Sequence, residues 1–499
     1  YRPQVVGETE KRLWEPNSDD DALQLALKAD GSSVRSDIYT RDILDEAYIS
    51  EVGPNIYKSF IERMNTLKST NKINDWESAA YDWRLSLDQI LASGTEMGQN
   101  ISYLTATDTP YIVQELRRLA AASRTGKVTV VAHSNGGLVA KAMMEKLGTT
   151  TTSALIDKVI LIAVPQVGTP AAIAGLLHGY DQNIPFKVSE SAMRQIGNNA
   201  PAIYNLLPSS DYFTYVDDPV ATFDPATLPD WVSRYGSTIH SKERLHTFLT
   251  SAYERVASSS TDTINPVQLH DTLLTQAESI HASLDAWTPP IGVQLIQIAG
   301  WGIPTTLKGI EYASTSRSIF CFAVCEDGLA LTPSTTIDGD GTVVVPSALW
   351  TSTTTGAVNY WVDLNEYNRD HPILSALGPT KFKHARILET DPVLSLIANT
   401  VTDSLVMPDQ YIFTQEPTGD GNRLRYTLHS PLTLNLYDDQ GRHTGVSTTT
   451  NKIEEQVPGT YYMQFDEVKY IFTDASTTAN IVMTGYAPGS FTFNVDQYN

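Results

Sequence analysis

The chain has few cysteines, few positive charges and no long apolar run. Its two cysteines, Cys321 and Cys325, stand four residues apart, and two ligands are too few for a structural zinc site. On a straight strand they would lie about 13 Å apart as free thiols, whereas a turn would allow a disulfide, and both states stay open. No stretch approaches the roughly 20 apolar residues that span a bilayer. The sequence therefore predicts no metal and no membrane-spanning helix.

The shortage of positive charge bears on partners. Lys and Arg number 35 against 57 Asp and Glu, which gives a net charge of -22. A surface of this sign disfavours nucleic acid and tight docking on anionic membranes, but it leaves a neutral or zwitterionic lipid surface open. The 499 residues allow two or three domains, and 41% of them are hydrophobic, enough for sizeable cores. This composition is consistent with an exported protein, so we expect an extracellular or cell-surface location.

A strand-to-helix turn around Ser134 is the most informative feature that the sequence does contain. The β-branched run 128–131 leads into Ala132, and the apolar residues of 138–147 recur at helical spacing. Small residues flank the serine, at Ala132 and Gly136, as a strained turn between strand and helix requires. This context predicts a nucleophile elbow, which exposes the Ser134 hydroxyl at the carboxyl end of a sheet.

A nucleophilic serine needs a general base and a carboxylate that orients the base. In α/β-hydrolases they follow the serine in the order acid, then histidine. Two carboxylates stand in the turn Asp338-Gly-Asp340-Gly341, and His384 comes later, before a helix that we expect to begin near Asp391. The order of residues in the sequence fits this requirement.

Five separated motifs together resemble the lecithin:cholesterol acyltransferase-like branch of the α/β-hydrolases. They are Arg12-Leu-Trp-Glu-Pro-Asn17, Tyr81-Asp-Trp-Arg84, the Ser134 turn, Gly168-Thr-Pro170, and Asp338-Gly-Asp-Gly-Thr-Val343 followed by His384. A sixth stretch, 199–209, resembles part of that family's cap. The motifs span about four fifths of the chain in the expected order. The resemblance implies an α/β fold with a mostly parallel sheet, a helical cap insertion and no cofactor.

The resemblance also implies a role for each site residue. Asp340 is expected to be the acid, because the family places that residue directly before Gly-Thr-Val, and Asp338 is then expected to cap nearby amides. An acidic calcium loop is the competing interpretation of the same turn, although the later ligands of such a loop are absent. His384 is the expected base, and His371, which stands before a proline, is its closest rival.

These roles predict acyl transfer through an acyl-enzyme on lipid or other carboxylic esters. The Asn135 backbone N–H is the expected first oxyanion donor. Tyr81, Asp82 and Trp83 are candidates for substrate contact, while an Asp82–Arg84 ion pair beneath a packed Trp83 is an equally open interpretation. Another class of function also stays open, a surface or interaction protein that keeps a hydrolase scaffold without turnover.

The beginning of the sequence leads to a further expectation. In the family, the second oxyanion donor follows a strand upstream of the segment that matches 12–17, and no apolar β-branched run precedes that segment here. We expect an upstream segment, a separate cleaved chain, or a rearranged stretch before Arg12 to complete the sheet beside the run 128–132. A central strand without a neighbour would leave backbone groups unpaired.

The sequence predicts three regions. An α/β-hydrolase domain is expected over 1–405, with a cap insertion over about 169–290 and helices near 245–256 and 267–287. The apolar stretch 173–177 is a candidate either for a lid in transient contact with a lipid surface or for cap core. Short alternating strands over 406–499 predict an antiparallel β-sandwich; the expected strands are 423–429, 432–437, 461–465, 481–484 and 491–495.

Overall fold

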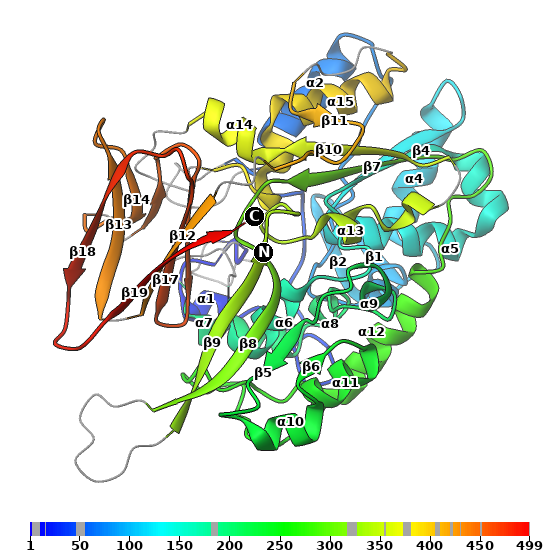
Figure 1. Cartoon of the computed structure of the whole chain (residues 1–499). Coiled ribbons are helices and arrows are strands. Elements are labelled where there is room, and N and C mark those ends of the chain that lie inside the picture. The colour runs from blue at the N-terminus through cyan, green and yellow to red at the C-terminus, as the bar shows by residue number, and fades with distance from the viewer. Residues whose placement is uncertain are drawn as a thin grey trace.

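The computed structural model describes most of the chain. The described residues are 1, 10–14, 16–45, 55–180, 188–316, 327–353, 356–372, 381–404, 410–419, 423–429, 431–449 and 452–498. They form a central sheet with flanking helices, an insertion between two strands of that sheet, and a pair of antiparallel sheets near the C-terminus (Figure 1). Cys321 and Cys325 lie outside the described residues, so their pairing stays open.

The central sheet has five strands in the order β11-β10-β7-β4-β3. Four of them run parallel: β3 (Val128–His133), β4 (Ile156–Ile162), β7 (Gln294–Trp301) and β10 (Val358–Asp363). The short β11 (Ile412–Phe413) pairs antiparallel with β10. The mostly parallel sheet predicted from the sequence is therefore present, and the Ser134 turn follows β3, at one edge of the described sheet.

Helices cover both faces of this sheet. On one face lie α2 (Lys58–Ser69) and α15 (Asp391–Val401), and α4 (Tyr111–Ala122) and α5 (Asn135–Leu155) lie on the other (Figure 1). Strand β4 shows why two apolar layers are needed: Ile160 and Ile162 belong to the core beneath α2 and α15, whereas Val159 and Leu161 belong to the core beneath α4 and α5. Strands buried on both faces are typical of parallel sheets.

The insertion lies between β4 and β7 and is mainly helical. Its elements are α6 (Pro170–His178), α7 (Glu190–Asn198), α8 (Pro201–Tyr204), α9 (Tyr212–Tyr215), β5 (Ala221–Phe223), α10 (Pro229–Tyr235), β6 (Thr238–Ile239), α11 (Lys242–Thr250) and α12 (Asp271–Leu284). The stretch 173–177 lies inside α6 and is fully buried. This stretch is therefore core of the insertion and is not available as a lipid-facing lid.

In the sequence, the stretch between the strand-like run 293–298 and Ile337 is interpreted as a loop. The structure instead has a hairpin there, formed by β8 (Thr306–Ser316) and β9 (Asp327–Thr336). It joins β5 and β6 in a second sheet with the order β6-β5-β8-β9. Leu307, Ile310 and Tyr312 from β8 are buried in the main core, so tertiary packing stabilises strands whose sequences are largely polar. The second sheet thus combines β5 and β6 of the insertion with β8 and β9, which follow β7 in the sequence.

The N-terminal region also departs from expectation. The Tyr81–Arg84 motif is expected from the sequence to end a strand at the active-site edge of the sheet. No strand ends there, since residues 75–82 contain no regular element. The strands that do occur, β1 (Ser93–Met97) and β2 (Asn100–Ala106), form a separate antiparallel hairpin. The remaining helices of this region are α1 (Asp19–Leu23) and α3 (Leu87–Ile90).

The Tyr81–Arg84 motif is held by a buried ion pair instead of a sheet. Arg84 donates from Nε to Asp82 Oδ1 at 2.8 Å and from Nη2 to Asp82 Oδ2 at 2.6 Å, and its Nη1 reaches the Leu25 carbonyl at 3.0 Å. Trp83 packs on Trp14, with ring centroids 4.5 Å apart. The ion pair left open by the sequence is the arrangement that the structure has.

Residues 423–498 form two four-stranded antiparallel sheets, ordered β16-β17-β12-β19 and β15-β14-β13-β18. Their strands are β12 (Arg423–His429), β13 (Leu432–Asp438), β14 (His443–Val446), β15 (Ile453–Glu455), β16 (Thr460–Phe465), β17 (Val468–Asp474), β18 (Ala479–Gly485) and β19 (Thr492–Tyr498). Sequence analysis missed β17, whose residues are all buried, so it lacks the alternation that marks a half-exposed strand.

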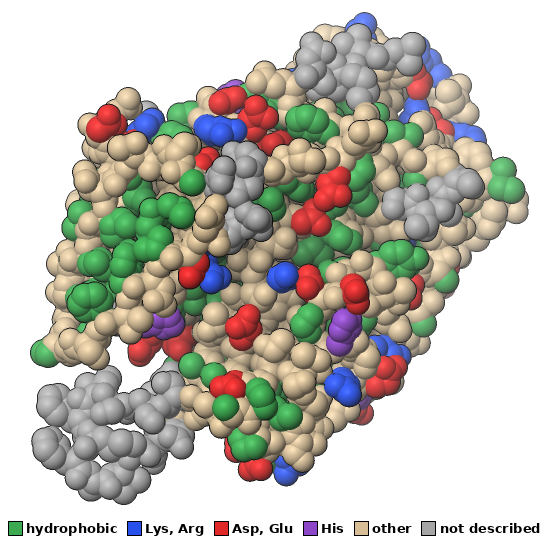
Figure 2. All heavy atoms as spheres, in the orientation of Figure 1, with side chains coloured by type: hydrophobic (Ala, Val, Ile, Leu, Met, Phe, Trp, Pro, Cys, Tyr) green, Lys and Arg blue, Asp and Glu red, His purple; other side chains and the backbone are tan. Residues whose placement is uncertain are grey.

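The surface mixes charges of both signs on the face in Figure 2, where apolar side chains gather over the C-terminal sheets. Exposed large apolar residues of these sheets and their connections are Val482, Met483, Tyr486, Phe491 and Val495. Within the described part of the chain, no helix is both long and apolar enough to cross a membrane.

The buried ion pair gives a first prediction. Arg84→Met should lower the unfolding free energy by about 3–5 kcal/mol in urea titrations at pH 7, because the variant leaves the buried Asp82 carboxylate without its partner. The double variant Asp82→Asn, Arg84→Met should recover part of the loss. An Arg84→Met protein as stable as the parent would show that this pair does not hold the motif.

Candidate active site

Ser134 lies in the turn between β3 and α5. Its backbone has φ 51° and ψ -131°, a left-handed conformation that is strained for a residue with a side chain. Its N–H donates to the Ile162 carbonyl of β4 at 3.0 Å. Three residues on, a Cβ on Gly137 would lie 2.2 Å from a methyl carbon of Val164, so glycine allows α5 to approach the segment that follows β4 this closely. The predicted elbow geometry is present.

The structure brings Ser134, His384 and Asp340 together. His384 Nε2 lies 2.8 Å from Ser134 Oγ, and His384 Nδ1 lies 2.7 Å from Asp340 Oδ2. The backbone N–H of His384 also donates to the Asp340 carbonyl at 2.8 Å. His371 lies elsewhere, stacked on Tyr367 with its Nδ1 3.0 Å from the carbonyl of that residue. Of the two candidate histidines, His384 is the one beside the serine.

The loop that carries Asp340 is braced from several sides. Asp340 Oδ1 accepts the backbone N–H groups of Thr342 at 3.0 Å and Val343 at 2.8 Å, which leaves Oδ2 for His384. Thr169, in the Gly-Thr-Pro motif, donates its hydroxyl to the Thr342 carbonyl at 2.5 Å. A Cβ on Gly300 of β7 would lie 2.6 Å from Asp340 Cβ. A glycine at the end of β7 therefore makes room for the acid.

Asp338 caps no amide among the described residues, contrary to the expectation from the sequence. Its Oδ1 is buried without a hydrogen-bond partner in the part of the chain that the structure describes. Burial, with a smaller contribution from the negative charge of Glu416, raises the pKa of Asp338 to about 7. The capping role belongs to Asp340. Among the described residues, no group of three or more His, Cys, Asp and Glu side chains could hold a metal ion.

A second histidine, which sequence analysis missed, contacts the backbone of the proposed base. His133 Nε2 lies 3.1 Å from the His384 carbonyl, and its Nδ1 lies 2.8 Å from the Tyr57 hydroxyl. Burial, followed by repulsion from His384, lowers the pKa of His133 to about 3. His133 is therefore neutral near pH 7 and places no positive charge beside the base. The sequence signal that could have identified His133 is its position directly before Ser134.

The other predicted site residues divide into two groups. Asn135 begins α5, where the first backbone N–H groups have no partner within the helix. Its side-chain Nδ2 lies 3.5 Å from the Tyr81 hydroxyl, so Tyr81 is near the serine turn. Asp82 and Trp83 are engaged with Arg84 and Trp14, as described above.

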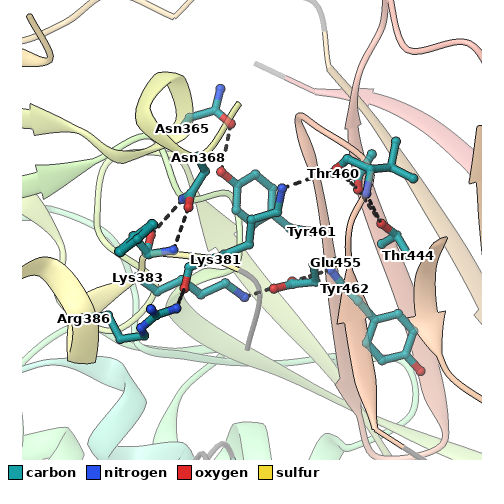
Figure 3. Close-up of polar contacts among 12 residues, drawn as sticks. Asn365, Asn368, Lys381, Lys383, Arg386, Thr444, Glu455, Thr460, Tyr461 and Tyr462 are labelled. Atoms are coloured by element: carbon teal, nitrogen blue, oxygen red, sulfur yellow. Dashed lines mark hydrogen bonds and ion pairs between the residues drawn. The ribbon is translucent and has the colours of Figure 1, made fainter. Parts of the chain in front are cut away.

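The segment that carries His384 is attached to the C-terminal sheets (Figure 3). Lys383 Nζ lies 3.0 Å from Glu455 Oε1 of β15, and Lys381 Nζ donates to the Val457 carbonyl at 3.3 Å. Just before the base, the Phe382 N–H donates to Asn368 Oδ1 at 2.6 Å, and Asn368 Nδ2 returns a bond to the Phe382 carbonyl. Asn368 lies in α14 (Leu364–Asp370), so two elements fix this segment.

The remaining short elements connect these parts. They are α13 (Val345–Ala348), η1 (Trp350–Thr353) and η2 (His384–Glu389). The last of these begins at the base itself.

Comparison with known families decides the assignment. The lecithin:cholesterol acyltransferase family matches residues 19–369, which is more than half of the chain. The chain belongs to this family. The lecithin:cholesterol acyltransferase match covers Ser134 and Asp340 and ends before His384, and it supports the α/β-hydrolase fold seen in the central sheet. No curated protein matches the chain.

Several solved structures are distantly similar. The Tle4–Tli4 complex is 14% identical with a TM-score of 0.36, and the match covers 59% of this chain and 64% of that one. The propeptide form of Bacillus licheniformis lipase BlEst2 is 11% identical with a TM-score of 0.24, over 77% and 62%. Phospholipase PlaB from Legionella pneumophila is 9% identical with a TM-score of 0.23, over 89% and 87%. The chain thus spans less than two thirds of the length of the first two of these structures. Because all three TM-scores are low, the assignment to a family rests on the family match alone.

The unpaired carboxyl of Asp338 gives a second prediction. The folded pKa of Asp338, about 7, lies above the ordinary value of 3.8. Ionisation of this carboxyl therefore lowers the unfolding free energy of the protein as pH rises from about 4 to 7. Asp338→Asn should therefore be more stable than the parent at pH 8, by about 2 kcal/mol once the full shift is discounted for partial exposure, and the gain should vanish near pH 4. Urea unfolding at the two pH values measures this difference.

Asp439→Asn, at an exposed aspartate, is the control and should show no comparable gain. Equal stability differences at pH 4 and pH 8 for Asp338→Asn would contradict the raised pKa.

Proposed function

We propose that the protein is a serine esterase or acyltransferase that acts on lipid or other carboxylic esters. The observation that carries the proposal is the chain of contacts from Ser134 Oγ through His384 to Asp340 Oδ2, at 2.8 and 2.7 Å. Membership of the lecithin:cholesterol acyltransferase family supports ester chemistry on lipids. Together they favour catalysis over a scaffold that only binds.

In the proposed mechanism, Asp340 fixes the tautomer of the base. Its Oδ2 accepts the Nδ1–H of His384, which leaves Nε2 unprotonated and facing the Ser134 hydroxyl. His384 takes the hydroxyl proton as Ser134 Oγ attacks the ester carbonyl, and Asp340 stabilises the imidazolium that forms. His384 then gives that proton to the departing alkoxide, and an acyl-enzyme remains on Ser134.

The oxyanion of the tetrahedral intermediate needs preorganised donors, and the Asn135 N–H at the start of α5 is the proposed first one. The acyl group leaves the enzyme when water or an alcohol, deprotonated by His384, attacks the acyl carbon. The bond from that carbon to Ser134 Oγ then breaks, and His384 returns the proton to the serine oxygen. Hydrolysis and transfer share every residue named here and differ in the acceptor.

A fluorophosphonate probe tests the nucleophile. The probe should label the parent at Ser134, and Ser134→Ala should abolish labelling and lower the turnover of a p-nitrophenyl ester by about 10⁴-fold or more. His384→Ala should have a similar effect, whereas His371→Ala, the matched control, should retain activity.

Unchanged labelling of Ser134→Ala would place the nucleophile elsewhere. A folded parent that neither reacts with the probe nor turns over esters would favour the non-catalytic surface protein.

The contact between Lys383 and Glu455 gives a further prediction. Glu455→Gln weakens the ion pair next to the base, so kcat should fall by about twofold to tenfold with little change in KM, because a looser base is less well aligned. The effect should be modest, because Lys383 is partly exposed and solvent screens its ion pair with Glu455. Glu454→Gln is the matched control, since Glu454 lies beside Glu455 on β15 but contacts His443 of β14. Equal kcat values for the two variants would exclude a positioning role for Glu455.

A further inference from the structure

The proposed base is held by its backbone as well as by its side chain. The His384 N–H donates to the Asp340 carbonyl at 2.8 Å, and the His384 carbonyl lies 3.1 Å from Nε2 of His133. His133 ends β3 and directly precedes Ser134. The strand that carries the nucleophile is therefore tied to the backbone of the base, by a contact separate from the bond between Ser134 Oγ and the His384 ring.

The partners of His133 fix the direction of its hydrogen bonds. A carbonyl oxygen can only accept, so Nε2 of His133 carries the proton that it donates to His384. Burial lowers the pKa of His133 to about 3, and a neutral imidazole has a single N–H. Nδ1 is therefore an acceptor, and the Tyr57 hydroxyl, 2.8 Å away, is its donor. Burial raises the pKa of Tyr57 above its ordinary value, so this hydroxyl keeps its proton near neutral pH.

The residues on either side of Tyr57 contact η2, the short helical segment whose first residue is the proposed base. Arg386 of η2 donates from Nε to the Asn55 carbonyl at 3.2 Å. Ser59 donates its backbone N–H and its hydroxyl to the two carboxylate oxygens of Glu389, the last residue of η2, at 2.9 and 2.5 Å. The Tyr57 hydroxyl is therefore held at a fixed position relative to the base.

We propose that His133 and Tyr57 are positioning residues for His384: Tyr57 fixes the tautomer and orientation of the His133 ring, and His133 holds the His384 backbone in line with the serine. This inference rests on the proposed function, because it concerns the support of the proposed base. Neither residue lies in the path of the proton, which moves between Ser134 Oγ and His384 Nε2. A displacement of about 1 Å in such an arrangement can lower the rate about 100-fold.

Substitutions at the two residues test the proposal on a p-nitrophenyl ester. His133→Phe keeps a ring and removes both nitrogens, so kcat should fall by about tenfold to 100-fold with KM within about twofold, because alignment of the base is lost and substrate contacts are not. His133→Gln should recover most of kcat, since its amide N–H can donate to the His384 carbonyl. Tyr57→Phe should lower kcat less, by about threefold, because the carbonyl still favours the Nε2–H tautomer.

A double variant tests whether Tyr57 acts through His133. With both residues changed to Phe, kcat should equal that of His133→Phe alone, because effects within one network are not additive. His178→Phe is the matched control. His178 is a buried histidine of α6 that also lies between a carbonyl, of Thr263, and a tyrosine hydroxyl, of Tyr312, at 2.9 Å each. This variant should unfold at a lower urea concentration than the parent and keep the parental kcat.

NMR of the protein with isotopically labelled histidine nitrogens reads the tautomer without any need for activity. The ring signals that disappear in His133→Phe should show a protonated Nε2 and a bare Nδ1 in the parent, with no titration between about pH 5 and 8. An Nδ1–H tautomer, or a ring that titrates in this range, would overturn the inference.

Kinetic outcomes separate this inference from the proposed function. A parent that neither turns over esters nor reacts with a fluorophosphonate would overturn the proposed function, and the positioning role with it. An active parent whose His133→Phe variant keeps the parental kcat would overturn the positioning role alone. If His133→Phe does not fold, Tyr57→Phe decides, since an unchanged kcat in that variant would overturn the role of the pair.

Discussion

The register of the parallel sheet is the constraint on which the site depends. His133, Ile162 and Ile298 are aligned across β3, β4 and β7, so these strands end at a common edge. The chain turns into α5 at one end of this row, where Ser134 takes its left-handed conformation. Two residues beyond Ile298, Gly300 lacks the Cβ that would meet Asp340. A shift of either strand by one residue would place the wrong side chain beside the acid.

The serine, the base and the acid are each held by a different part of the protein. The elbow belongs to the central sheet, the acid loop is braced by Thr169 at the start of the insertion, and the segment before His384 is attached to the C-terminal sheets through Glu455. Alignment at hydrogen-bond distance therefore depends on packing between regions that are far apart in sequence. A rigid supporting shell of this kind preserves catalytic geometry.

Sequence patterns were informative where local chemistry decides the structure. The elbow at Ser134 follows from small residues and a change of periodicity, and β12 and β13 follow from alternation. Sequence patterns failed where tertiary contacts decide the local structure. The β8–β9 hairpin is held by buried contacts with the insertion, β17 is buried throughout, and the Asp82–Arg84 pair replaces the strand expected before it. The alignment of His133 beneath His384 depends on a contact across 251 residues, which no local pattern encodes.

The strand that leads to the candidate active site is an edge strand of the described sheet. Within the described sheet, the backbone of β3 is restrained by β4 on one side only, and Ser134 stores its strain at the end of that same strand. Because His133 also bonds the carbonyl of His384, any displacement of β3 would reach the base as well as the serine.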